Sequence, residues 1–219
     1  ESDNAKAYEL YLRAKYAYKN RKDEEDIFIT RDLLNQAIIL DDTLTVAKHL
    51  LGITYANMGT INDNEIALKN FMNNLEQAEL SKDKNAISSA LHMMAYTICL
   101  DDIDKAHEYN LRSLKISQEL GNKEMELRTI NNIGNYYREK ENYSEALKYY
   151  LRSKEMCEEL EDIYSLGFPK WNIGCIYFRS IQYDKALKVL NKTLLESEKS
   201  NNREIIARAS ASIGQILCY

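Results

Sequence analysis

Four cysteines are the side chains of this sequence best suited to nucleophilic chemistry or metal binding. They are Cys99, Cys157, Cys175 and Cys218, separated by 58, 18 and 43 residues, and none belongs to a C-x-x-C pair. Zinc sites and disulfide frameworks need closer or paired spacings. The sequence therefore predicts four buried thiols in a reducing compartment, where cysteine packs like a small apolar residue.

The histidines are weaker candidates for metal binding. His49 and His92 are 43 residues apart, and no third ligand accompanies them at a fixed spacing. Two histidines alone do not complete a zinc site. We therefore predict no metal and no cofactor, and we expect both histidines to be polar groove residues or packed side chains. His107 is expected to be structural.

No enzyme motif accompanies these residues. The sequence contains no glycine-rich phosphate loop, no G-x-S-x-G elbow and no H-E-x-x-H pair, and these are the motifs that would support phosphate binding, acyl transfer or zinc-dependent hydrolysis. The sequence therefore predicts a protein that is not an enzyme.

The scarcity of glycine and proline indicates which elements position the candidate residues. The 219 residues include seven glycines and one proline, although a chain of this length must turn many times to be compact. Long helices joined by short corners satisfy both conditions. We expect helices over residues 4–20, 25–40, 43–58, 63–80, 84–99, 102–120, 123–139, 143–160, 165–180, 183–199 and 203–218. Gly59, Gly121 and Gly167 are expected at corners, where glycine can take the left-handed conformation that ends a helix.

Two series of small residues recur with one period of about 40 residues. The alanines Ala67, Ala106, Ala146 and Ala186 are spaced by 39, 40 and 40, and the residues Gly52, Ala95, Gly134, Gly174 and Gly214 are spaced by 43, 39, 40 and 40. A glycine inside a helix costs about 1 kcal/mol relative to alanine. Its recurrence indicates that a second helix approaches closely at that point, so each period is expected to be a pair of helices, A and B.

These periods resemble tetratricopeptide repeats, whose pattern places a small residue in helix A, an aromatic residue three positions later and an alanine in helix B. Gly134, Tyr137 and Ala146 fit that pattern, as do the corresponding residues of two other periods, Gly174, Tyr177 and Ala186 and Gly52, Tyr55 and Ala67. The usual repeat has 34 residues, so this chain is similar to the long repeats found in bacterial signalling and regulatory proteins and in cell-polarity scaffolds. HEAT repeats share the period but do not resemble these motifs.

The resemblance implies an all-α fold, a right-handed superhelical solenoid of antiparallel helix pairs. It implies a single domain over residues 1–219, with repeats at about 4–42, 43–82, 83–122, 123–162 and 163–202 and a partial repeat at 203–219. It also implies a concave groove lined by helix A that binds peptides or protein segments. The implied peptide-binding residues are Arg128, Asn131, Asn135, Arg138, Trp171, Phe178, Arg179, His92 and Tyr96.

The chemistry of these groove residues suits a peptide ligand. Asn131 and Asn135 would bond backbone amides, the arginines would pair with carboxylates, and Trp171 and Phe178 would anchor an apolar group. The alternative is that the two aromatic side chains pack between repeats and the arginines are solvated.

Charge and hydropathy narrow the class of partner. The net charge of −5 argues against nucleic acid, which normally binds a basic surface, and no apolar run is long enough to span a membrane. We expect a soluble, cytoplasmic protein-binding or regulatory module, a fragment of a larger signalling protein. The segment 7–13 resembles the start of repeat regions attached to bacterial nucleotide cyclases.

The last expected helix supports a second reading, self-association. Residues 212–215 repeat the helix A motif, but no helix B follows before residue 219. One apolar side of that helix would be uncovered, which predicts further chain downstream or a homodimer formed through this C-terminal helix.

Overall fold

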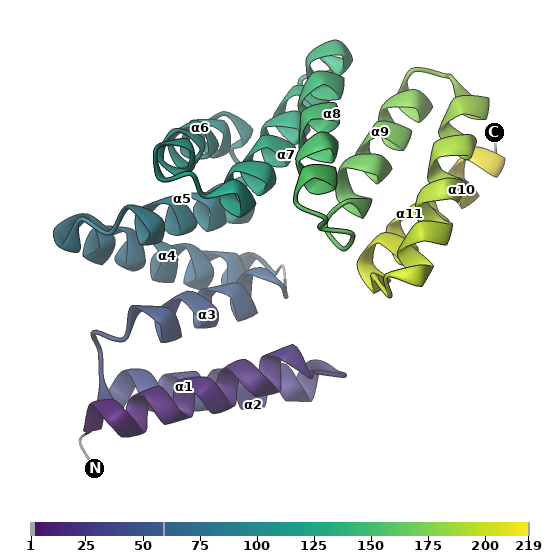
Figure 1. Cartoon of the computed structure of the whole chain (residues 1–219). Coiled ribbons are helices and arrows are strands. Elements are labelled where there is room, and N and C mark those ends of the chain that lie inside the picture. The colour runs from purple at the N-terminus through teal and green to yellow at the C-terminus, as the bar shows by residue number, and fades with distance from the viewer. Residues whose placement is uncertain (1–2, 59, 219) are drawn as a thin grey trace. The chain divides into compact units, whose positions relative to one another are not determined.

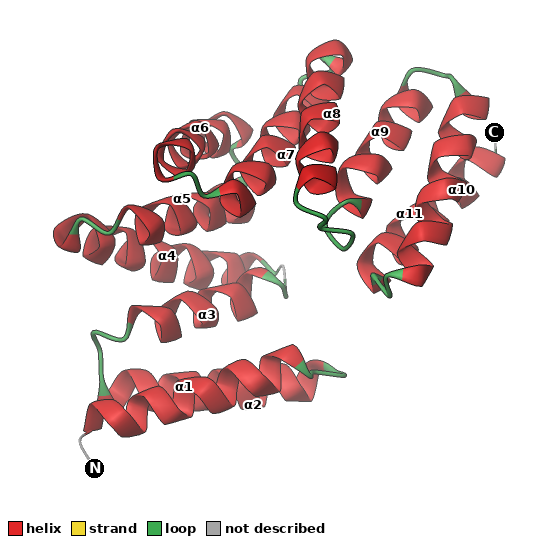
Figure 2. Ribbon diagram, viewed as in Figure 1, coloured by secondary structure: helices red, strands yellow, loops and turns green. Residues whose placement is uncertain are grey.

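The computed structural model describes residues 3–58 and 60–218, and these residues form eleven α-helices and no strand (Figures 1 and 2). The helices are α1 (Asp3–Lys19), α2 (Glu24–Leu40), α3 (Thr45–Ala56), α4 (Ile61–Ser81), α5 (Lys84–Ile98), α6 (Ile103–Leu120), α7 (Lys123–Glu139), α8 (Tyr143–Glu159), α9 (Gly167–Arg179), α10 (Tyr183–Lys199) and α11 (Arg203–Leu217). Each begins and ends within two residues of its prediction. The predicted all-α fold of antiparallel helix pairs is confirmed. No helix in the described part of the chain is long and apolar enough to cross a membrane.

The chain divides into two compact units, Glu1–Ile116 and Ser117–Tyr219, which we call unit 1 and unit 2. In unit 1, α1 packs on α2, α3 packs on α4, and α4 packs on α5. In unit 2, α7 packs on α8, α9 packs on α10, and α10 packs on α11. That residues 1–219 form a single domain remains a prediction.

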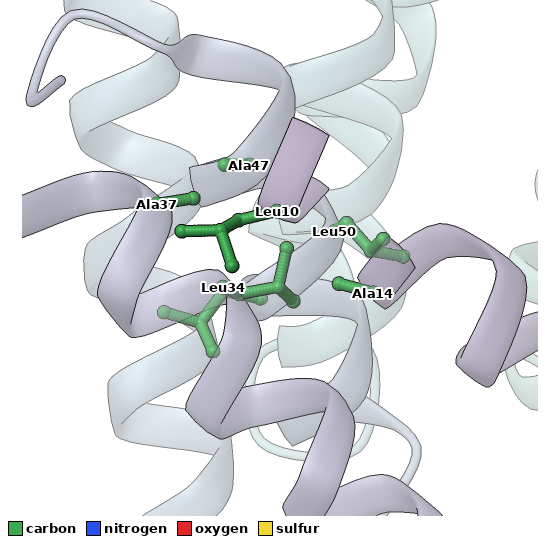
Figure 3. Packing of buried hydrophobic residues seen from close by; sticks show 7 residues of the cluster. Leu10, Ala14, Leu34, Ala37, Ala47 and Leu50 are labelled. Carbon is green, nitrogen blue, oxygen red and sulfur yellow. The ribbon is translucent and has the colours of Figure 1, made fainter. Parts of the chain in front are cut away.

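Small side chains set the packing distance in the core of unit 1. Ala14 of α1, Ala37 of α2 and Ala47 of α3 are fully buried, and they lie beside Leu10 and Leu34 (Figure 3). Burying apolar side chains contributes roughly 25 cal/mol for each Å² removed from water. The alanines allow three helices to approach closely enough for the leucines to be enclosed.

The periodic glycines mark the contacts between paired helices, as the sequence predicts. A Cβ atom at three of them would lie 2.6 Å from a side-chain carbon of the paired helix B. The pairs are Gly52 with Phe71, Gly134 with Tyr150 and Gly174 with Leu190. Gly214 of α11 differs, because no heavy atom outside its immediate neighbourhood lies within 4 Å of the corresponding position.

Most corners use residues other than glycine, which explains why glycine is scarce. A positive φ angle occurs at Lys82, Gly121, Glu141, Glu161, Ile181 and Asn201. In unit 2 these residues recur every 20 positions, and the next residue closes a six-residue turn, as where the Asn142 N–H donates to the Tyr137 carbonyl at 2.8 Å. That bond is the signature of the Schellman motif. Asn142 then accepts from the Glu145 N–H and caps the next helix.

Two expectations about corners and thiols need correction. Gly121 takes the left-handed conformation as predicted, but Gly167 does not, because it already lies at the start of α9 against Ile205. Gly59 lies outside the described residues. The four thiols are free but not all buried: Cys157 is buried, whereas Cys218 is exposed because it follows the last apolar contact of α11.

Candidate functional site

A buried asparagine organises the predicted groove residues of unit 2. Asn172 of α9 is 2% exposed. Its Nδ2 donates to Asn131 Oδ1 at 3.1 Å, and its Oδ1 accepts from Arg138 Nη1 at 2.8 Å. The structure therefore brings together two predicted residues of α7 through a third residue that the prediction missed. The repeat spacing could have pointed to Asn172, because it follows Asn131 by 41 residues, which is about one period.

The charge of Arg138 is balanced within the protein. Its side chain is 17% exposed, and it forms an ion pair with Glu139 at 2.9 Å. Burial alone lowers the pKa of Arg138, but Tyr150 and Glu139 outweigh it, so that the pKa is raised. The guanidinium is permanently charged, and it is held in one orientation by Asn172 and Glu139 together.

Asn135 is oriented by a tyrosine of the paired helix. The buried hydroxyl of Tyr150 donates to Asn135 Oδ1 at 2.8 Å. Burial raises the pKa of Tyr150, so the hydroxyl stays protonated and keeps its role as donor. Within the described residues the Nδ2 group of Asn135 donates no hydrogen bond, and it is left to a ligand or to water.

The two predicted aromatic anchors lie partly buried against a core cluster of unit 2. Trp171 and Phe178 pack on buried Leu190 and Ile216. The Trp171 Nε1 group donates to Ser212 Oγ at 3.1 Å. Both rings therefore contribute to the packing of α9 on its neighbours, and only their exposed parts can contact a ligand.

Arginines from three helices influence the thiol of Cys175 on α9. Burial raises the pKa of this thiol, while Arg138, Arg179 and Arg208 each lower it. Arg208 pairs with Glu204 at 2.8 Å and lies 5.0 Å from the centre of the Trp171 ring. Arg179 is exposed, and no ion pair holds it among the described residues. This part of unit 2 can therefore accept an anionic group at Arg179.

Arg128 is placed differently from the other predicted arginines. It is exposed and pairs with Glu124 on the same helix at 2.6 Å. An exposed pair of this kind contributes little to stability. Arg128 is therefore a solvated surface residue in this structure, which was the alternative to a role in the groove.

The predicted residues of unit 1, His92 and Tyr96, both lie on α5. His92 is half-buried, and Tyr96 is 47% exposed. His49 on α3 packs edge-on against Phe71 at 5.6 Å, and burial lowers its pKa. In the described part of the chain, no three His, Cys, Asp or Glu side chains are grouped closely enough to hold a metal ion.

Comparison with known protein families identifies the repeats. Residues 98–159 and 125–195 match the profile of the tetratricopeptide repeat family. No curated protein sequence matches the chain.

Several solved structures share the fold at low sequence identity. A Rap protein complexed with competence and sporulation factor is 14% identical, with a TM-score of 0.79 over 93% of this chain and 57% of that one. Aspartyl phosphate phosphatase F from Bacillus subtilis is 16% identical, with a TM-score of 0.72 over 93% of this chain and 54% of that one.

A signal transduction ATPase with numerous domains, from Pyrococcus horikoshii, also has the fold in its tetratricopeptide repeat sensor. It is 19% identical, with a TM-score of 0.63 over 85% of this chain and 31% of that one. The chain thus spans only a third to somewhat more than half of these three proteins.

Proposed function

Because the chain is a tetratricopeptide repeat domain, we propose that it binds a peptide or protein segment, catalyses no reaction and serves as a regulatory module of a larger signalling protein. The proposed binding surface lies in unit 2, on α7, α9 and α11. The observation that carries the proposal is the Asn172 bridge, which holds Asn131 and Arg138 of α7 in fixed positions. Among the described residues, the Nδ2 group of Asn135 and the exposed side chain of Arg179 are left unused.

The residues of this surface have different roles in the proposal. Arg179 pairs with a carboxylate of the ligand, and Asn135 donates to a backbone carbonyl. Arg138 and Asn131 are held by Asn172 and keep the surface in one shape before the ligand arrives, which reduces the entropy lost on binding. The exposed parts of Trp171 and Phe178 form its apolar floor.

The structural relatives are consistent with a regulatory role. One is a Rap protein solved in complex with competence and sporulation factor, and another carries its tetratricopeptide repeats as a sensor in a signal transduction ATPase. On this proposal the present chain couples the binding of a peptide to an activity outside it. His92 and Tyr96 of unit 1 would contact a different part of the partner.

Fluorescence anisotropy with a labelled panel of acidic, neutral and basic hexapeptides tests the proposal. We expect the acidic peptides to bind best, and we expect the double variant Asn135→Ala and Arg179→Gln to weaken them more than tenfold. Arg128→Gln is the matched control, because that arginine is exposed on the same surface but paired with Glu124. Equal capture by the double variant and the wild type would refute the assignment to this surface.

Self-association through α11 is a second candidate, favoured by one observation. The helix A contact at Gly214 is open, whereas Gly134 and Gly174 are covered by helix B. Leu217, one turn further along α11, is 71% exposed. Light scattering over a hundredfold range of concentration should then detect a dimer that Leu217→Glu dissociates, and a monomer at every concentration would exclude it.

A further inference from the structure

A hollow of about 450 Å³ lies in unit 1 against two helices B, α4 and α6, whereas the predicted groove is lined by helix A. Its apolar lining consists of Met72 and Leu75 from α4, Tyr109 from α6 and Met94 from α5. Met94 is 2% exposed and belongs to the core, and Leu75 and Tyr109 pack against the same core cluster. Met72 is 55% exposed. The hollow therefore reaches a core side chain on one side and is open to solvent at Met72.

The polar residues of the hollow all belong to α4. They are Lys69, Asn73, Glu76 and Glu79. Glu79 pairs with Arg112 of α6, and Asn73 accepts from Lys48 Nζ at 3.2 Å. Glu76 is exposed, and no cation among the described residues pairs with it. The hollow thus offers an uncommitted carboxylate beside an apolar wall.

The equivalent carboxylate of unit 2 has a partner on its own helix. Counting from the helix B alanines, each residue of α4 corresponds to the residue of α8 that lies 79 positions later, so Glu76 corresponds to Glu155. Arg152 pairs with Glu155 at 3.5 Å. The residue of α4 that corresponds to Arg152 is Asn73, whose side chain has no charge. Glu76 is therefore uncommitted because α4 carries an asparagine where α8 carries an arginine.

The apolar wall of the hollow arises in the same way. Leu75 corresponds to Lys154 of α8, which pairs with Glu158 at 2.9 Å. Glu79, which corresponds to Glu158, pairs instead with Arg112 of α6. Two cations that neutralise carboxylates on α8 thus have no counterpart on α4, which leaves the hollow with an apolar wall and a free carboxylate.

The charges of the hollow favour a ligand with a single cation on an aliphatic stem. Glu76 attracts a cation, and this attraction is stronger where the ligand excludes part of the surrounding water. Lys69 lies about two helical turns before Glu76 on α4 and repels a second cation. Met72 and Tyr109 offer apolar contact to the stem. A lysine side chain has this chemistry, because its methylene stem is apolar and carries one compact ammonium group.

The exposure of the hollow favours a protein partner over a free small molecule. Pockets for free ligands enclose roughly 70–90% of the ligand surface, but Met72 and Glu76 are both exposed, so the hollow covers a bound group on one side only. We propose that the hollow receives a lysine side chain of a partner protein, whose methylenes contact Met72 and Tyr109 and whose ammonium pairs with Glu76. The surface of the partner then covers the outer side. The proposal does not rest on the surface proposed in unit 2, because every residue that lines the hollow belongs to unit 1.

Titration of the full chain with the capped pentapeptide acetyl-Ala-Ala-Lys-Ala-Ala-amide, followed by the backbone amide resonances of the chain, tests the proposal. We expect saturable shifts around Met72, Glu76 and Tyr109. Peptides in which norleucine keeps the stem without the charge, or diaminopropionate keeps the charge on a shorter stem, should each bind about fivefold more weakly. The absence of saturable shifts, or shifts of equal size around Glu155 of α8, would overturn the proposal.

Substitutions then test the role of the carboxylate. Glu76→Gln, at an exposed position, should weaken the lysine peptide about fivefold. Glu155→Gln is the matched control and should leave the affinity unchanged, because Glu155 already pairs with Arg152. Asn73→Arg gives α4 the cation that α8 has, and it should weaken the lysine peptide as much as Glu76→Gln while leaving Glu76 in place. The proposal fails if either Glu76→Gln or Asn73→Arg binds the peptide like the wild type.

Two further measurements identify the source of the cation. Free n-pentylammonium should bind about fivefold more weakly than the lysine peptide, and equal affinity would assign the hollow to a small amine and overturn the choice of a protein partner. Light scattering of the chain alone, at the concentration of the titration, should detect no oligomer that Glu76→Gln dissociates. Such an oligomer would place a lysine of a second copy in the hollow and would likewise overturn that choice.

A last variant distinguishes the hollow from the surface proposed in unit 2. The double variant Asn135→Ala and Arg179→Gln should bind the lysine peptide like the wild type, although it should lose the acidic hexapeptides. A loss of the lysine peptide in this variant would contradict a site confined to unit 1.

Discussion

Asn172 in unit 2 and Asn74 in unit 1 are both buried asparagines, but they differ in the hydrogen bonds that their side-chain amides make. Asn172 uses both atoms of its amide, one toward Asn131 and the other toward Arg138. Asn74 uses neither. The difference teaches that burial alone does not show whether an asparagine connects helices, because only the hydrogen-bond partners of its amide distinguish Asn172 from Asn74.

The repeats are also more regular in unit 2 than in unit 1. In unit 2 a left-handed corner recurs every 20 residues from Gly121 to Asn201, whereas Lys82 is the one such corner in the described part of unit 1. The match to the tetratricopeptide repeat family, at residues 98–195, falls mostly on unit 2. Regular helix pairs bring equivalent residues of successive repeats into register, which is how Asn172 comes to bond Asn131 of the preceding repeat.

The largest expected effect is the loss of the paired amide. Asn172→Ala leaves the half-buried Arg138 and Asn131 without their shared partner, so we expect unit 2 to lose about 3 kcal/mol of unfolding free energy. Hydrogen exchange measured separately on peptides of units 1 and 2 checks this. Protection in unit 2 that matches the wild type would show that the asparagine bridge is not structural.

Glycine substitutions should affect the two units alike. Gly52→Ala and Gly134→Ala each place a Cβ 2.6 Å from a ring carbon of a fully buried Phe71 or Tyr150. Overpacking exceeds the gain in helix propensity, and we expect each to cost about 1–2 kcal/mol. Thermal unfolding measures this, with Gly214→Ala as a control that should be neutral or stabilising. A marked difference between Gly52→Ala and Gly134→Ala would mean that helix packing, rather than polar pairing, distinguishes the units.

Asn74→Ser should have the opposite sign to Asn172→Ala. It removes a buried amide with no partner among the described residues, so we expect unit 1 to gain about 1 kcal/mol of unfolding free energy. Urea unfolding of the full chain, compared with Asn73→Ser, provides the measurement. A loss of stability as large as that of Asn172→Ala would show that Asn74 is satisfied within the folded chain.

The smallest expected effect is a dependence on pH in unit 1. Burial lowers the pKa of His49 below its ordinary value of 6.5. The unfolded chain therefore takes up this proton first as the pH falls, and the stability present above pH 6.5 is lost as the pH falls through the lowered pKa. The His49→Gln variant should lose less stability between pH 7 and pH 5 than the wild type. Equal losses would exclude His49 as a source of the pH dependence.

The helices could be predicted from the sequence because their signals are local and repeated. The spacing of Gly134, Gly174 and the helix B alanines determined the helix pairs, and the contact with Tyr150 follows directly from it. The corners were harder to predict. Glu141 and Ile181 take the left-handed conformation that is normally associated with glycine, so their residue types give no sign of a corner. Only their spacing of 40 residues sets them apart from other positions of the sequence.

The candidate sites were less predictable because they depend on partners rather than on residue types. The family pattern identified Asn131, Asn135 and Arg138, but it omitted Asn172, which connects two of them. Asn74 lies on helix B, outside the predicted groove. Nothing in its neighbouring residues reveals that its amide has no partner, since that depends on three other helices.

The most direct test of this comparison measures the unfolding free energies of Asn172→Ala and Asn74→Ser side by side on the full chain. We expect Asn172→Ala to lose about 3 kcal/mol and Asn74→Ser to gain about 1 kcal/mol. A loss of stability in both variants, or in neither, would contradict the claim that only the Asn172 amide is bonded within the protein.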